Sequence, residues 1–311
     1  MSDICWMSWE GTAVARVPRT RIANVNVDGV NVFYREAGDA TAPVVLLLHG
    51  VPSSSFMFRD LMPRLADRFH VIAPDYPGFG FTQIMDRSDY AYTFDGLADT
   101  IRRFTEILEL HSFAIYVQDY GGAVGLRIAL KHPDRISAIV AQNIGLYVEA
   151  MTDPVWDDMK TTWADPTPER LRAFRDYFDY DNTKFEWLLG VRDPDAVAPE
   201  TYTLDYALLQ RPGVVDIQVD LLLDFKTELD HYPKYQRYLR DHQPPVLAVF
   251  GDGDTYFPPL TVELLRRDLP QAEIYLYPSG HFALETHVDE IAERIQEFLA
   301  RTFSVRGVGA N

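Results

Sequence analysis

Three polar side chains, Asp119, Asp254 and His281, each come just after an apolar run of the kind that forms a buried strand. The carboxyl ends of parallel strands meet at one edge of a sheet, so we expect these side chains to lie together. A carboxylate can act as a nucleophile, and a histidine oriented by a second carboxylate can act as a base. The chain order nucleophile, acid, histidine also suits a nucleophile held on a strand-to-helix turn. Two carboxylates, Asp252 and Asp254, follow the apolar run at 245–250, and Asp254 is preferred as the acid; the residue after the run at 136–142 is the neutral Asn143.

The stretch VQDYGG at 117–122 places a charged residue where a buried strand meets a helix. A nucleophile on such a tight turn needs small neighbours, and Gly121 and Gly122 follow at once. The helix N-terminus that begins there favours negative charge, which would keep Asp119 ionised. Asp119 could instead serve only as the N-cap of that helix, since Asp is a favoured cap. The placement of Asp254 and His281 favours the nucleophile.

Around these residues the chain alternates between strand-like and helix-like segments. The stretch 21–36 alternates polar and apolar residues on both sides of Asp28-Gly29, which predicts a hairpin. Apolar runs and amphipathic segments then alternate, and this pattern predicts an α/β fold with a mostly parallel sheet flanked by helices. The predicted strands are 44–48, 70–74, 112–118, 136–142, 245–250 and 272–277, and the predicted helices are 54–66, 92–110, 121–131, 260–269 and 285–301.

The alternation stops between residues 145 and 243, where the chain becomes helical in pattern and rich in Trp, Tyr, Asp and Pro. We therefore predict a helical domain at 145–243, inserted into a core domain formed by 21–144 and 244–303. Residues 1–20 are expected to form an N-terminal arm. They lack the basic start and apolar core of a signal peptide, and no stretch of the chain reaches the ~18 apolar residues of a membrane span.

The composition of the 311 residues narrows the possible partners. A formal net charge of −17 disfavours nucleic acid and membranes, because nucleic acids and anionic membranes are bound through basic surfaces. The single cysteine, Cys5, allows no intramolecular disulfide, and a cytoplasmic location is expected. The histidines outside the candidate site, among them His132, His231 and His287, show no metal-ligand spacing, so neither a metal nor another cofactor is expected.

Five motifs together resemble the α/β-hydrolase superfamily, in particular its aspartate-nucleophile branch of epoxide hydrolases and haloalkane dehalogenases. The motifs are HGVP at 49–52, DYPGFGFT at 75–82, VQDYGG at 117–122, GDGDTYFP at 251–258 and GHFALE at 280–285. The resemblance covers residues from about 25 to 302. It implies an α/β-hydrolase fold in which the helical domain is a cap over the active site.

The resemblance also implies a two-step mechanism. Asp119 displaces a leaving group from an sp³ carbon to form an alkyl ester, which a water activated by His281 then hydrolyses. Asp254 orients His281, and the backbone N–H groups of Val51 and Tyr120 form the oxyanion hole. The expected partners are a small apolar organic substrate and water, and the expected state is a monomer or a homodimer.

The sequence is compatible with two leaving groups, a halide and an epoxide oxygen. In the family a departing halide receives N–H bonds from a Trp after the nucleophile and from a second Trp or Asn, whereas this chain has Tyr120 and Val51. An opening epoxide receives a proton from cap tyrosines, and the cap is rich in tyrosine, although Phe225 stands where a second one is expected. We favour an epoxide hydrolase, with a haloalkane dehalogenase as the alternative. A non-hydrolytic enzyme or a ligand-binding member of the fold is the alternative of another class.

Six residues are candidates for substrate binding, because they lie in the cap or beside the predicted nucleophile. They are His49, Tyr147, Trp156, Trp163, Tyr177 and Phe225. Tyr147 and Tyr177 are the first candidates for the proton donor, and each tryptophan could donate to a halide or simply pack in the core of the cap.

Overall fold

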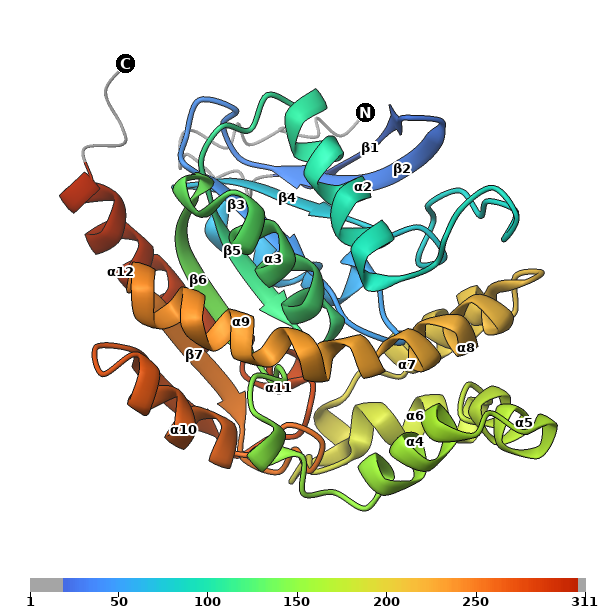
Figure 1. The fold of residues 1–311 in the computed structure, drawn as a ribbon. Helices are drawn as coiled ribbons and strands as arrows, with labels where there is room; N and C mark the ends of the chain where they lie inside the picture. Colours follow the sequence, from blue (N-terminus) through green and yellow to red (C-terminus); the bar gives the residue numbers. More distant parts are fainter. Residues whose placement is uncertain (1–18, 307–311) are drawn as a thin grey trace, which may run out of the picture.

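The sheet of this protein is mostly parallel, as the alternation of strands and helices predicts. The computed structural model describes residues 19–306, so the predicted arm lies almost wholly outside them. The described residues form an eight-stranded sheet in the order β1-β2-β4-β3-β5-β6-β7-β8 (Figure 1). β2 is antiparallel to both β1 and β4, and the remaining pairs are parallel. The strands are β1 (Arg21–Val27), β2 (Val30–Ala37), β3 (Val44–Leu48), β4 (His70–Pro74), β5 (Phe113–Gln118), β6 (Ile136–Gln142), β7 (Val246–Gly251) and β8 (Glu273–Tyr277).

Helices cover both faces of this sheet because its central strands are apolar on both sides. Leu46 and Leu48 of β3 belong to the core beneath α2 and α3, whereas Val45 and Leu47 belong to the core beneath α1 and α12. This alternation follows from the two-residue period of a strand. The helices that flank the sheet are α1 (Leu61–Leu65), α2 (Phe94–Ile107), α3 (Tyr120–Lys131), α10 (Leu260–Asp268), α11 (Ala283–Thr286) and α12 (Val288–Arg306).

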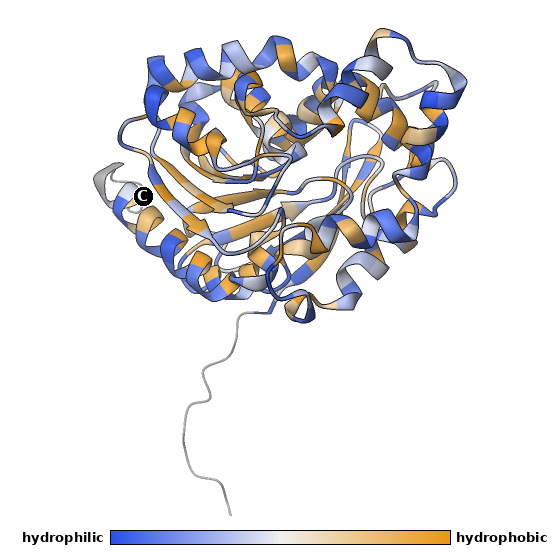
Figure 2. Ribbon diagram, turned by 90° about the horizontal axis from the view of Figure 1, so that it is seen from below, coloured by the Kyte–Doolittle hydropathy of each residue, from blue (hydrophilic) through white to orange (hydrophobic). Residues whose placement is uncertain are grey.

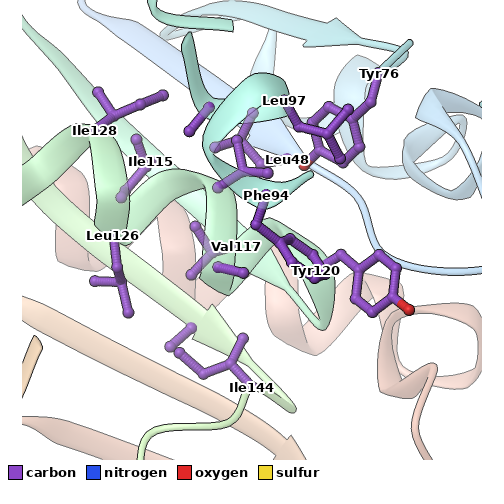
Figure 3. Packing of buried hydrophobic residues seen from close by; sticks show 14 of the residues in the cluster. Leu48, Tyr76, Phe94, Leu97, Ile115, Val117, Tyr120, Leu126, Ile128 and Ile144 are labelled. Carbon is purple, nitrogen blue, oxygen red and sulfur yellow. The ribbon is translucent and has the colours of Figure 1, made fainter. Parts of the chain in front are cut away.

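The apolar interior is visible in two views. Figure 2 shows mostly hydrophobic strands between helices whose outer surfaces are largely hydrophilic. Figure 3 shows the core under α3, where Leu48, Ile115 and Val117 of the sheet pack with helix residues such as Leu126 and Ile128. A sheet buried on both faces gives the residues at the ends of its strands a rigid base.

The chain between β6 and β7 holds the helical insertion (residues 145–243). Its helices are α4 (Val155–Ala164), α5 (Pro168–Asp176), α6 (Tyr180–Leu188), α7 (Pro199–Leu209), α8 (Val214–Asp224) and α9 (Lys226–His242). α9 runs back along α3, while α4, α5 and α6 stand away from the sheet (Figure 1). The insertion therefore has one part packed on the sheet layer and one part that projects beyond it.

The hairpin at 21–36 is confirmed, with Asp28 at φ 49° and Gly29 at φ 101° between β1 and β2. The predicted strands are also present, with ends that agree to one residue. The single helix predicted at 54–66 is wrong: a 3₁₀ turn at Ser55–Phe58 precedes the short α1. Pro63 explains the break, because it has no backbone N–H to donate to residue 59.

None of the helices within residues 19–306 is long and apolar enough to cross a lipid bilayer.

Candidate active site

Asp119 lies on a strained turn between β5 and α3. Its φ of 50° and ψ of −116° place a non-glycine residue in a region that costs free energy. A Cβ on Gly121 would lie 2.1 Å from the backbone oxygen of Leu48, and one on Gly50 would lie 2.5 Å from Oδ1 of Asp119. Both positions therefore require glycine for the turn to approach the end of β3.

The side chain of Asp119 makes no capping hydrogen bond to α3. The structure therefore does not support the alternative in which Asp119 serves only as the N-cap of this helix. Oδ1 of Asp119 instead accepts the backbone N–H of Val51 at 2.8 Å, and the backbone N–H of Tyr120 also bonds the carboxylate. The two N–H groups expected to form an oxyanion hole thus both face the candidate nucleophile.

His281 connects Asp119 to Asp254. Its Nδ1 lies 2.8 Å from Oδ2 of Asp254, and its Nε2 lies 3.8 Å from Oδ2 of Asp119. The other oxygen of Asp254 accepts the backbone N–H groups of Tyr256 at 2.8 Å and Phe257 at 3.2 Å. The three residues predicted to act together are therefore adjacent, although their chain positions span more than 160 residues.

Burial and charge act in opposite directions on these groups. Burial lowers the pKa of His281, but the carboxylates of Asp254 and then Asp119 outweigh it and raise that pKa to about 9. Burial raises the pKa of Asp119, while protonated His281 and the N–H groups of Val51 and Tyr120 oppose the rise. An imidazolium paired with two carboxylates is the arrangement that these shifts favour near neutral pH.

Gln118, the last residue of β5, completes the surroundings of His281. Its amide nitrogen lies 2.7 Å from Nε2 of His281, and its Oε1 has no other partner among the described residues. Rotation of the amide by 180° would exchange the two atoms. Gln118 can therefore donate to neutral His281 or accept from the protonated form.

A cavity of about 730 Å³ opens at Asp119 and His281. Its lining is mainly apolar near these two residues and more polar toward α4 and α5. The lining residues include Val51, Tyr120, Trp156, Met159, Phe174, Tyr177, Glu186, Leu222, Phe225, Tyr256 and Phe257. A cavity of this size fits a drug-sized apolar molecule.

Trp156, Tyr177 and Phe225 line this cavity as the sequence predicts, but neither candidate tryptophan directs its N–H into it. The indole N–H of Trp156 donates to the backbone oxygen of Tyr256 at 3.3 Å. The indole N–H of Trp163 donates to the backbone oxygen of Leu222 at 2.8 Å, and Trp163 is not among the lining residues. Trp163 packs behind Phe225 instead.

Two further candidates lie outside the cavity lining. His49 is buried, stacks on Tyr76 with ring centroids 4.1 Å apart, and has its Nδ1 3.0 Å from the backbone oxygen of Gly50. Burial lowers the pKa of His49 to about 4, which favours the neutral form of the ring that packs on Tyr76. The hydroxyl of Tyr147 donates to Asp268 at 2.7 Å and Tyr147 is not among the lining residues, so the structure does not bring this predicted proton donor into the cavity.

Sequence reasoning missed Glu186 and Tyr256. The hydroxyls of Tyr177 and Tyr256 both donate to Oε1 of Glu186, the latter at 3.0 Å. Burial raises the pKa of Glu186 to about 7, against the hydrogen bonds from the phenols and the charge of His281. Tyr256 could have been found, because it lies two residues after Asp254 in one of the motifs. Glu186 gave no signal, since it is one of many acidic residues in an irregular helical segment.

No group of three or more His, Cys, Asp or Glu side chains in residues 19–306 is arranged to hold a metal ion.

Comparisons with known proteins agree with this fold. A family model described as "alpha/beta hydrolase fold" matches residues 43–187. A Saccharomyces cerevisiae protein described as "Uncharacterized hydrolase YNR064C" is 44% identical over 276 residues, which cover 88% of this chain and 94% of the yeast protein. "Haloalkane dehalogenase 2" of Mycobacterium tuberculosis is 37% identical over 105 residues, 34% of this chain and 36% of that protein. The crystal structure of Cfl2 from Burkholderia cenocepacia has a TM-score of 0.75 at 23% identity, covering 91% of this chain and 97% of that one, and shows the same fold.

Proposed function

This chain belongs to the α/β-hydrolase fold family and is a hydrolase, and on that premise we propose that it opens epoxides through an ester on Asp119. The yeast relative and the family model support the hydrolase activity, whereas the nucleophile and the leaving group are our proposal. The helical insertion acts as the cap that closes the cavity over Asp119. The substrate is a small organic epoxide whose apolar part lies along the cavity lining.

In the first step an Asp119 oxygen attacks an epoxide carbon and the C–O bond of the ring breaks. A carboxylate attacks an sp³ carbon readily when it is desolvated and fixed, and Asp119 is held by two backbone N–H groups. The product is a hydroxyalkyl ester of Asp119. The neutral ester no longer carries the charge that Asp119 had.

That loss of charge prepares His281 for the second step. The Asp119 carboxylate is one of the groups that raise the pKa of His281, so the pKa falls when the ester forms. Neutral His281, held through Nδ1 by Asp254, then takes a proton from water as the water attacks the ester carbonyl. The N–H groups of Val51 and Tyr120 stabilise the oxyanion that develops on that carbonyl.

The proposal of an epoxide, and not a haloalkane, rests on the hydrogen-bond donors in the cavity. The phenols of Tyr177 and Tyr256 reach the cavity beside Glu186, whereas the indole N–H groups of Trp156 and Trp163 are bonded to backbone oxygens. A halide needs N–H donors, and an opening epoxide needs a proton. The cluster of Glu186, Tyr177 and Tyr256 supplies exchangeable protons, so this observation supports the epoxide.

A haloalkane dehalogenase is the second candidate, because the Mycobacterium tuberculosis relative of that name matches part of this chain at 37% identity. Both reactions would begin with the same ester on Asp119. They differ in whether a proton or a halide site serves the leaving group.

Incubation with two matched substrate sets tests the proposal. Styrene oxide and 1,2-epoxyhexane would be compared with 1-chlorohexane and 1-bromohexane, with diol and halide release measured separately. We expect diol from the epoxides, no halide release, and no turnover by the Asp119→Asn variant. Halide release without diol formation would replace the epoxide proposal with the dehalogenase.

A further inference from the structure

One carboxyl group in the cavity is not used by the proposed ester chemistry. Glu186 is 5% exposed, lies on α6 and lines the same cavity as Asp119 and His281. A buried carboxyl in an apolar site is costly unless it is protonated or well bonded. Its placement beside the reacting residues makes it a candidate for a chemical role.

The two oxygens of Glu186 have different surroundings. Oε1 accepts hydrogen bonds from both phenols, those of Tyr177 and Tyr256. Oε2 makes no hydrogen bond to another described residue, and it is not fully enclosed by protein atoms. Glu186 lines the cavity, and the proton of its neutral form belongs on Oε2, the oxygen that the phenols leave free.

The phenols are unsuited to give a proton directly in this arrangement. Both phenols bond Oε1 of Glu186 and also bond each other, so donation to a substrate would break a hydrogen bond within this cluster. Burial also raises the pKa of both phenols far above neutral, with Glu186 adding to the rise. A carboxylic acid is the stronger acid of the available donors.

We propose that Glu186 is the general acid that protonates the epoxide oxygen from Oε2, and that Tyr177 and Tyr256 position it. This rests on the proposed function, because only an oxygen leaving group needs the proton. An Asp119 oxygen forms a bond to carbon, the ring C–O bond breaks, and the released electron pair takes the Oε2 proton. The products of this step are a neutral hydroxyalkyl ester and a Glu186 carboxylate, which the two phenols stabilise through Oε1. Once Asp119 is an uncharged ester, protonated His281 passes its proton to the Glu186 carboxylate, which restores the acid form of Glu186. Ester hydrolysis then transfers a proton from water to neutral His281 and regenerates the imidazolium beside the Asp119 carboxylate.

The charges that face Glu186 set the pH range of this step. Burial raises its pKa to about 7, the phenols of Tyr177 and Tyr256 and the charge of His281 lower it, and Asp119 raises it. Only the protonated form can donate, so the rate of ester formation should fall as pH rises through about 7. Removal of a phenol takes away a bond that lowers this pKa, so the fall should then move to higher pH.

Rapid-quench measurement of ester formation with styrene oxide tests the proposal. In Glu186→Gln, which keeps the shape and an oxygen for the phenols, we expect ester formation to slow by about 10²- to 10⁴-fold. The remaining slow reaction should lose its fall with pH. Tyr177→Phe should slow ester formation much less than Glu186→Gln does, and it should shift the fall to higher pH. Ester formation by Glu186→Gln at the wild-type rate would overturn the proposal.

Asp205→Asn is the matched control, because Asp205 is also a buried carboxyl of the insertion whose pKa burial raises to about 7. It accepts the indole N–H of Trp187 at 2.9 Å, a bond that Asn can keep, and it does not line the cavity. Its ester formation should match the wild type. If Glu186→Gln does not fold, the test is the pH dependence of ester formation in the wild type and in Tyr177→Phe. The proposal is contradicted if the fall in rate with rising pH occurs at the same pH in both. Absence of any ester in the wild type would instead overturn the proposed function.

Discussion

Asn143 donates from its Nδ2 to Oδ2 of Asp254 over 2.8 Å, at the same oxygen that accepts Nδ1 of His281. The Oδ1 of Asn143 accepts the backbone N–H of Gly251 at 2.9 Å, so Asn143 is fixed at both ends. Asn143, the residue directly after β6, thus contacts the acid that follows β7. The neutral residue there orients Asp254 without adding a charge beside it.

We expect Asp254→Asn to slow hydrolysis of the Asp119 ester by orders of magnitude, because His281 loses the carboxylate that orients it and makes it basic. The ester should then accumulate during turnover, which intact-mass measurement would detect. Asp252→Asn is the control, since Asp252 pairs with Arg192 at the surface over 2.8 Å. A damaging Asp252→Asn with a nearly silent Asp254→Asn would show that the wrong aspartate has been assigned.

The turn at Asp119 predicts that alanine at Gly121 and alanine at Gly122 destabilise the protein to different extents. A Cβ at Gly121 would meet a backbone oxygen at 2.1 Å, whereas one at Gly122 would meet Cγ2 of Ile144 at 2.9 Å. A side chain can shift and the end of β3 cannot. Gly121→Ala should therefore lower the free energy of unfolding by more than Gly122→Ala, measured by denaturant titration, and should abolish ester formation. Equal costs for the two variants would contradict this account of the turn.

Tyr147→Phe should affect stability and not catalysis. The variant leaves Oδ2 of the buried Asp268 without the hydroxyl that bonds it at 2.7 Å. Loss of a hydrogen bond to a buried charged group should lower the free energy of unfolding by about 1–3 kcal/mol. Denaturant titration measures that change, and rapid quench should show unchanged ester formation. Slower ester formation in a variant that keeps its stability would return Tyr147 to the site.

The second step should have its own pH dependence. His281 must be neutral to act as the base, so the rate of ester hydrolysis should fall as pH is lowered. Its pKa of about 9 belongs to the enzyme with Asp119 ionised. The ester lacks that charge, so the midpoint of the fall should lie below this value. Single-turnover decay of the ester across pH measures it, and a decay that quickens on acidification would argue against a histidine base.

Much of this site follows from the sequence because its main parts lie at strand ends. Apolar runs fix β5, β7 and β8, and the residues that follow them meet at one edge of the sheet. Asp119, Asp254 and His281 could therefore be placed together without coordinates. The 3₁₀ turn at Ser55–Phe58 does not follow from the apolar pattern of 54–66, because that pattern does not report the backbone N–H that Pro63 lacks.

The helical insertion was harder to interpret from the sequence, because its helices pack at angles that no local pattern encodes. Tyr147 follows a sheet strand closely, which suggested a place beside the nucleophile, yet its hydroxyl reaches Asp268 on α10. Trp156 and Trp163 carry N–H donors, but only the structure shows that backbone oxygens occupy them. The partnership of Glu186 with Tyr256 joins α6 to the loop after β7, and no spacing in the sequence reports it.

The ester on Asp119 is the central claim, and the His281→Gln variant tests it most directly. This variant keeps the nucleophile but lacks the base for the second step, so the ester should form and persist. After incubation with styrene oxide, intact-mass measurement should show a gain equal to the whole epoxide, because ring opening loses no atoms. Peptide mapping should place the addition on Asp119. Unmodified His281→Gln protein, with an epoxide that the wild type converts to diol, would contradict a carboxylate nucleophile.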